Sequence, residues 1–304
     1  SYFPNTEFVL RILVNIFEQQ NKKDEAINIY LQLISIIPQD LELYTNLGIL
    51  YIESGKLKKA EKNFRKAIEL NSYDFSSQYN LGITLIDLGK LEEAELRLRM
   101  AITINSNYSE VHYKLGSLMY KLGKIKEAEL SLKQAIIVDP KNFLALNALG
   151  VIAQNLKKHN DAEVYFKEAI KFNPNYHLSY FNIGLLYKKS GYIEKAISSY
   201  RKAILLNSNH CSYYYNLANT LYQKGNIEEA IINYKASIKL NPNFLEAWNN
   251  LYFSIQTTKP KKNYSRNYIS SLLKKELNII NNVFLNILEY KLHNGEAQAE
   301  YYYN

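Results

Sequence analysis

Apolar residues recur along the chain at spacings of three and four, which place side chains on one face of an α-helix. In residues 41–74, Tyr44, Leu47 and Tyr51 predict a first helix that ends near Gly55. A second helix is predicted from three further positions with the same spacing, Ala60, Phe64 and Ala67. The pattern therefore indicates a pair of helices joined by a turn.

The same pair is repeated along the sequence with a period of 34 residues. One glycine series follows this period: Gly48, Gly82, Gly116, Gly150 and Gly184. A second glycine series follows it with one position skipped: Gly55, Gly89, Gly123, Gly191 and Gly225. An alanine series confirms the period: Ala26, Ala60, Ala94, Ala128, Ala162, Ala196 and Ala230. Three series in one register indicate an internal repeat.

Each series predicts a structural role. Glycines such as Gly82 let the two helices of a unit approach closely, and a bulky replacement there is expected to overpack the contact. The series of Gly55 marks helix ends where the backbone adopts a positive φ. Asn21 and Lys157 take this place in two units, and at Lys157 we expect local strain or a different turn. The second helices are predicted to end at the pairs Asn71-Ser72, Asn105-Ser106, Asp139-Pro140, Asn173-Pro174, Asn207-Ser208 and Asn241-Pro242.

Composition narrows the class of protein. Hydrophobic residues at 47% and charged residues at 22% argue against a disordered or fibrous chain. No apolar run reaches the length of a membrane span, and the first residues lack the pattern of a signal peptide. The single cysteine, Cys211, excludes an internal disulfide, so a cytoplasmic location is expected. The chain begins with Ser1 and ends at Asn304 without a helix-stop signal, which favours a fragment of a longer protein.

A unit with this period and these residues resembles the tetratricopeptide repeat family. The resemblance implies an all-α fold, a right-handed superhelical solenoid of helix-turn-helix repeats, with the first helix of each pair lining a concave groove. It covers about residues 7–256, which hold seven units and the first helix of another. We therefore expect a repeat array at 1–256 and a helical extension at 257–304, with a degenerate and truncated further unit.

The sequence offers little that could carry catalysis. The histidines form no HExxH or HxH arrangement, and there is no glycine-rich phosphate loop. His112 falls on the face where Tyr44 and Tyr180 stand, so it is expected to pack in the core, whereas the other histidines are expected at the surface or in turns. We therefore predict no enzymatic activity for this chain, no metal site and no cofactor.

An amide series is the strongest candidate for binding. The residue before each Leu-Gly pair, or its equivalent, is Asn46, Asn80, Lys114, Ala148, Asn182, Asn216 or Asn250. An asparagine side chain can pair with the C=O and N–H of an extended peptide. The series resembles the asparagine ladder in the repeats of O-linked N-acetylglucosamine transferases, which implies that it faces the groove. The alternative is that it reflects only the abundance of asparagine in this chain.

An aromatic series lies one residue earlier, at Tyr79, Tyr113, Phe181 and Tyr215. These side chains have two interpretations: they stack on a ligand's side chains, or they fill the inner wall of the groove against one another. Together with the amides they predict a scaffold whose groove binds an extended segment of a partner protein.

Three alternatives remain open. One alternative is that the array selects substrates for a larger enzyme of glycosyltransferase or sulfotransferase type, whose catalytic domain is absent from this chain. Co-chaperone members of the family grip a terminal carboxylate with a clamp, and here Arg11, Asn15 and Asn46 match its first places, but Ser76 and Asn80 stand where cations are needed. Nucleic acid is the least favoured partner, because the basic segment 259–266 is short and the 34-residue period differs from that of RNA-reading repeats.

Overall fold

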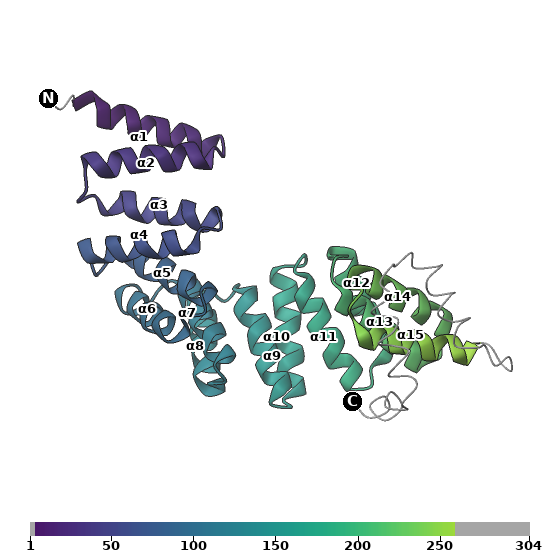
Figure 1. Ribbon diagram of the computed structural model, residues 1–304. Helices are drawn as coiled ribbons and strands as arrows, with labels where there is room; N and C mark the ends of the chain where they lie inside the picture. Colours follow the sequence, from purple (N-terminus) through teal and green to yellow (C-terminus); the bar gives the residue numbers. More distant parts are fainter. Residues whose placement is uncertain (1–3, 259–304) are drawn as a thin grey trace. The chain divides into compact units, whose positions relative to one another are not determined.

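The computed structural model describes residues 4–258, and in that part of the chain all regular secondary structure is α-helical (Figure 1). The fifteen helices there are α1 (Pro4–Gln19), α2 (Lys23–Ile36), α3 (Leu41–Glu53), α4 (Leu57–Leu70), α5 (Phe75–Asp87), α6 (Leu91–Ile104), α7 (Ser109–Lys121), α8 (Ile125–Val138), α9 (Phe143–Asn155), α10 (His159–Phe172), α11 (His177–Lys189), α12 (Ile193–Leu206), α13 (Cys211–Lys224), α14 (Ile227–Leu240) and α15 (Leu245–Thr258). The all-α prediction is confirmed. The predicted extension lies outside the described residues, apart from the end of α15.

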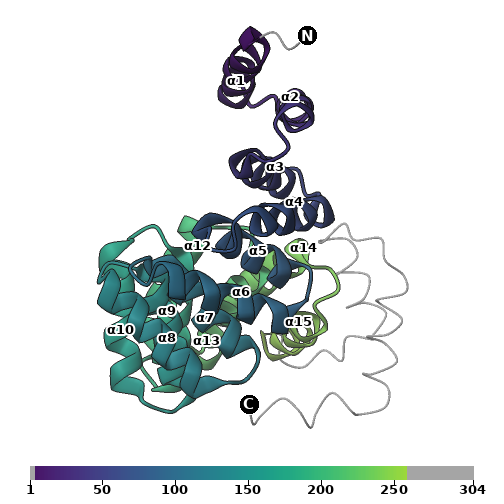
Figure 2. The ribbon, with the colours of Figure 1, turned by 90° about the vertical axis from the view of Figure 1, so that its left-hand side faces the viewer.

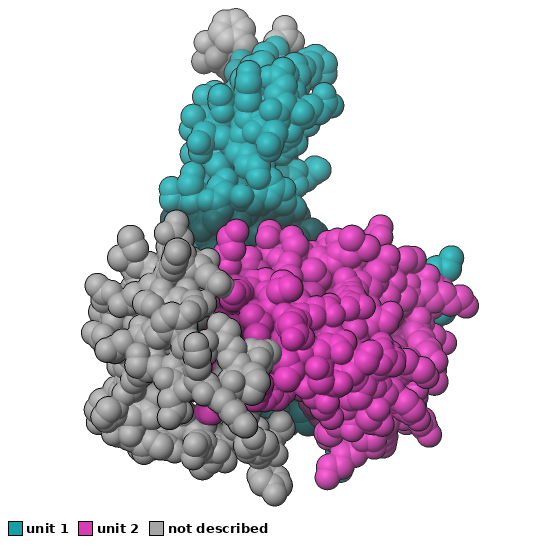
Figure 3. Space-filling view, turned by 90° about the vertical axis from the view of Figure 1, so that its right-hand side faces the viewer, with its two compact units in different colours: residues 1–149 teal, residues 150–304 magenta. Residues whose placement is uncertain are grey.

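The helices form two compact units, residues 1–149 and residues 150–304, which are coloured separately in Figure 3. In the first unit α1 packs on α2, α3 on α4, α5 on α6 and α7 on α8, and Figure 2 shows the first two of these pairs nearly end-on. In the second unit α11 packs on α12 and α13 on α14. Within each unit the second helix of a pair also packs on the first helix of the next. Helix pairs stacked in this way are the expected repeat.

The first glycine series lies where the helices of a pair are closest. A Cβ atom on Gly48 would come within 2.5 Å of Phe64 Cε1, and one on Gly150 would come within 2.5 Å of Phe166 Cε1. Beside each glycine the alanine series is fully buried. The ring of Phe64 or Phe166 therefore fills the space that any side chain in place of the glycine would need, which confirms the packing role.

The second glycine series ends the first helices in the left-handed conformation, with φ values from +69° at Gly55 to +91° at Gly225. Asn21 and Lys157 have φ values of 55° and 59° at the same place, so Lys157 keeps the turn and carries the strain of a positive φ. After the second helices, six side chains each accept a hydrogen bond from the backbone N–H two residues later: Asn71, Asn105, Asp139, Asn173, Asn207 and Asn241. The predicted helix-ending pairs are therefore turns closed by their own side chains.

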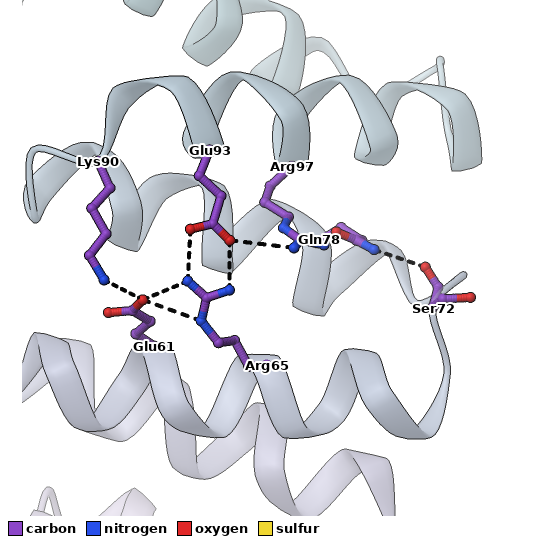
Figure 4. Close-up of polar contacts among 7 residues, drawn as sticks. All are labelled: Glu61, Arg65, Ser72, Gln78, Lys90, Glu93 and Arg97. Carbon is purple, nitrogen blue, oxygen red and sulfur yellow. Dashed lines mark hydrogen bonds and ion pairs between the residues drawn. The ribbon is translucent and has the colours of Figure 1, made fainter.

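A further contact links four of the turns to the helix that follows them. His112 Nε2 lies 2.9 Å from the carbonyl oxygen of Ser106, and His112 is buried, as predicted. The same tie to a carbonyl six residues earlier is made by Tyr44, Gln78 and Trp248. Figure 4 shows the tie from Gln78 to Ser72.

Ion pairs link successive second helices in the first unit (Figure 4). Arg65 of α4 contacts both carboxylate oxygens of Glu93 of α6, at 2.6 and 2.7 Å. Lys90 contacts Glu61 at 2.6 Å. One period later the same arrangement recurs as Arg99 with Glu127 and Lys124 with Glu95.

These contacts shift the protonation equilibria of the carboxyl groups. Burial alone would raise the pKa of Glu61, but hydrogen bonds from Lys90 and Arg65 outweigh it and hold this pKa below its ordinary value. The hydrogen bond from Arg65 likewise lowers the pKa of Glu93.

The close helix crossing predicts a cost for bulk at Gly82, where a Cβ atom would lie 2.9 Å from Leu98 Cδ2. Gly82→Met should lower the free energy of unfolding by about 1–3 kcal/mol, because the core must shift to admit the side chain. Urea denaturation followed by circular dichroism measures the change. The neighbouring Ile83→Met, at a half-buried position, is the matched control and should leave the midpoint nearly unchanged; equal midpoints for the two variants would contradict this role.

The left-handed turn predicts that Lys157→Gly stabilises the chain. A non-glycine residue in this conformation costs about 1–2 kcal/mol, and the added flexibility of glycine in the unfolded chain offsets about 0.5–1 kcal/mol of the gain. We expect a higher melting temperature and a net gain of up to about 1 kcal/mol. Gly123→Lys tests the reverse change and should destabilise; a fall in melting temperature for Lys157→Gly would show that the lysine is unstrained.

The ion pairs predict a loss of stability in acid. Glu61 has a lower pKa in the folded chain than in the unfolded chain, so it stabilises the fold above its ordinary pKa of 4.5, and this contribution disappears as the pH falls through the folded value. Urea midpoints measured from neutral to acidic pH should therefore fall less steeply for Glu61→Gln than for the unchanged chain. Parallel curves would mean that this group does not contribute.

Candidate peptide-binding surface

The first helices of successive repeats contact one another within each unit. In residues 1–149, α3 contacts α5 and α5 contacts α7; in residues 150–304, α11 contacts α13 and α13 contacts α15. Successive second helices make fewer contacts with each other. The first helices therefore lie on the inside of each unit's curvature, and we call the surface that they form the inner face.

In the first unit the amide series supplies Asn46 and Asn80, both half-buried. Asn80 Nδ2 donates to Ser76 Oγ at 3.2 Å, on the same helix. Asn46 interacts with the Tyr30 hydroxyl and lines a pocket of about 240 Å³ beside Glu18. The amides of this unit are thus oriented by contacts within the chain.

Lys114 holds the third place in the series and differs from the amides. Its ammonium group pairs with Glu110 at 3.3 Å and lies 5.4 Å from the centre of the Tyr113 ring. The side chain is therefore engaged with its own helix through charge.

In the second unit Asn182 on α11 and Asn216 on α13 are half-buried, and these two helices are in contact. Asn216 Nδ2 donates to the carbonyl oxygen of Ser212 at 2.9 Å. This bond uses one of the two N–H groups of the amide, so the other N–H and Oδ1 are left for a ligand.

Asn250 does not match the expectation that the series is available to a ligand. It is buried, and its Nδ2 donates to Asn219 Oδ1 at 2.7 Å. Asn219 Oδ1 also accepts a hydrogen bond from the Tyr234 hydroxyl at 2.6 Å. The position is shielded because α15 packs on α14, where Tyr234 lies, so Asn250 belongs to a structural network.

Three members of the aromatic series pack against neighbouring rings. Tyr79 is stacked on Phe75 with ring centres 5.8 Å apart, and Tyr108 meets it edge-on. In the second unit the ring centres of Phe181 and Tyr213 are 4.6 Å apart, and those of Tyr215 and Phe244 are 4.7 Å apart. Burial raises the pKa of Tyr79 above its ordinary value. These contacts favour the wall-filling interpretation, while the half-buried edges of the rings remain at the surface.

The sequence pattern does not identify two polar groups of the second unit as candidates for a functional role. Lys188 is half-buried on α11, and burial lowers its pKa. Tyr200 is fully buried, and its hydroxyl has no hydrogen-bond partner among the residues that the structure describes. The signal lay in the repeat register, where Lys188 takes the place that Tyr120 and Tyr222 hold in other units.

Other expectations concern chemistry away from the amides. Arg11, the first clamp position, already pairs with Asp40 at 2.6 Å and Glu7 at 2.9 Å. No group of His, Cys, Asp and Glu within residues 4–258 is arranged to hold a metal ion. The helices of that same range are all too short or too polar to cross a membrane. The basic segment from Lys259 lies outside the described residues.

Solved structures share this fold at low sequence identity. A tetratricopeptide repeat protein from Parabacteroides merdae matches 83% of this chain and 99% of its own, with a TM-score of 0.66 and 18% identity. PilF of Pseudomonas aeruginosa matches 72% of this chain and 97% of its own, with a TM-score of 0.63 and 20% identity. A chain of the APC/C hetero-tetramer Cut9–Hcn1 has a TM-score of 0.68 and 20% identity over 80% of this chain, which spans only 48% of that protein.

Family models give the more direct assignment. No curated protein sequence matches the chain significantly. Models of the tetratricopeptide repeat match at residues 9–44, 41–74, 63–95, 84–123, 109–142, 143–176, 178–210 and 212–244. Because these matches cover most of the sequence, the chain belongs to the tetratricopeptide repeat family.

Proposed function

We propose that the inner face of the second unit binds an extended segment of a partner protein through its backbone. Tetratricopeptide repeat proteins serve as protein-interaction scaffolds, and this proposal names the surface and the contacts in this chain. The two amides involved, Asn182 and Asn216, stand one repeat apart on neighbouring helices.

The fixed amide of Asn216 is the observation that carries the proposal. Its bond to the Ser212 carbonyl holds the side chain in one orientation before any ligand arrives. A group that is already ordered loses less conformational entropy on binding, so its hydrogen bonds contribute more affinity. At the same register of the first unit, Asn80 donates to the side-chain hydroxyl of Ser76, which also orients its amide and supports the same role there.

The resemblance to the asparagine ladder of O-linked N-acetylglucosamine transferases agrees with this proposal for Asn46, Asn80, Asn182 and Asn216. Lys114 and Ala148 depart from the ladder, and Asn250 is engaged in the core. Backbone recognition through a few amides would tolerate varied side chains, whereas the rings of Phe181 and Tyr215 limit the width of the path.

Replacing Asn182 and Asn216 together by Ala should weaken peptide binding without loss of the fold. Random peptides displayed on phage, selected on the unchanged chain, supply the probe. Each lost hydrogen bond removes about 0.5–1.5 kcal/mol, so the Kd of a selected peptide should rise by about 5- to 100-fold. Fluorescence anisotropy measures Kd, and circular dichroism checks helical content and melting temperature.

The matched control is the double change Asn175→Ala and Asn209→Ala, which removes two exposed turn amides from the same unit. It should leave Kd unchanged. Equal affinity for all three proteins would remove the amides from the binding surface, and failure to select any peptide would contradict the proposal as a whole.

A further inference from the structure

We propose that the inner face of the second unit selects an acidic side chain in the bound segment, and that Lys188 is the group that binds it. This inference rests on the proposed function, which supplies the bound segment. It adds a chemical requirement that backbone recognition by amides does not contain.

Lys188 occupies a place where its charge can reach a ligand. It lies in the last turn of α11, seven residues after Phe181 and three after Leu185, so the three side chains share one helix face. Its flanking residue Lys189 is exposed, whereas Lys188 is half-buried.

The charge of Lys188 is uncompensated. Among the described residues no carboxylate lies at ion-pairing distance from its ammonium group, although lysines elsewhere in the unit, such as Lys167 and Lys224, pair with Glu163 and Glu194. Burial lowers the pKa of Lys188, and no acidic group in the described part of the chain opposes this effect. A partly buried cation without a partner destabilises the folded chain. Such charges are typical of sites that bind an anionic group.

The hydroxyl of Tyr200 is a second donor that lacks an acceptor. Tyr200 belongs to a series of large residues that pack under the first helices, and the other two tyrosines of that series have partners. Tyr30 donates to Glu18 at 2.9 Å, and Tyr234 donates to Asn219 at 2.6 Å. The amide of Asn216, in the repeat that follows Tyr200, instead donates to a carbonyl of its own helix.

The first repeat has a carboxylate at the register position of Lys188. Glu18 and Tyr30 stand five periods before Lys188 and Tyr200, so the carboxylate that accepts from Tyr30 has the position that the lysine has here. The chain thus supplies its own acceptor in the first repeat and two donors in the sixth. A carboxylate from a ligand can accept hydrogen bonds from the half-buried ammonium group of Lys188, and no neutral side chain matches the lysine charge.

Selection of peptides tests this requirement directly. Random twelve-residue peptides displayed on phage are selected in parallel on the full chain, on Lys188→Met and on Lys189→Met. We expect Asp or Glu to be enriched at one position of the peptides from the unchanged chain and from Lys189→Met, and the enrichment to be lost for Lys188→Met. Methionine keeps the length and apolar stem of lysine, so the folded structure and melting temperature should be retained.

The Kd values of a selected peptide and of its Glu-to-Gln variant measure how much the acidic side chain contributes to affinity. For the unchanged chain, replacing the enriched Glu by Gln should raise Kd by about tenfold or more, because it removes one partner of a desolvated charge pair. The same replacement should change Kd little for Lys188→Met.

The outcomes separate this inference from the function on which it rests. Peptides without acidic enrichment, or with enrichment that persists in Lys188→Met, overturn the role of Lys188 while the amide-dependent binding stands. Binding that is lost in Asn182→Ala with Asn216→Ala and also depends on Lys188 supports both. If the unchanged chain selects no peptide, the proposed function and this inference fail together.

Discussion

The close approach of two helices at a glycine is the contact on which the rest of the structure depends. Where Gly48 faces Phe64 and Gly150 faces Phe166, a single Cβ atom would fall inside the ring's van der Waals radius. Because the same contact recurs every 34 residues, each pair repeats its geometry and presents the same side of its first helix. Position in the repeat therefore decides on which face of its helix a residue lies.

The two faces of each unit use charge differently. Between second helices, carboxylates such as Glu61 and Glu93 are paired with Arg65 and Lys90, and their pKa values are lowered as a result. On the inner face of the second unit, Lys188 has no such partner within residues 4–258. Paired charges stabilise contacts between successive repeats, whereas an unpaired and partly buried charge is available to stabilise a complex.

Much of the fold could be predicted from the sequence, because small residues at fixed register mark either a close contact between helices or a helix end with a positive φ. The register alone predicts local strain or a different turn at Lys157, and the structure has the strained left-handed turn there. Side-chain partners could not be predicted in the same way. Asn250 shares its register with Asn216, yet it is buried in a network with Asn219 and Tyr234, since hydrogen bonding depends on which residues neighbour it in three dimensions. For the same reason, the sequence does not predict that the hydroxyl of Tyr200 lacks a hydrogen-bond partner among the described residues.

The central claim is that fixed amides on the inner face bind the backbone of a partner. The side-chain amide resonances of ¹⁵N-labelled asparagine report this contact most directly during titration with a selected peptide. The resonances of Asn182 and Asn216 should shift and saturate together, while those of the turn residues Asn175 and Asn209 stay in place. Shifts confined to the turn residues, or an unchanged Asn216 resonance at saturation, would contradict the claim.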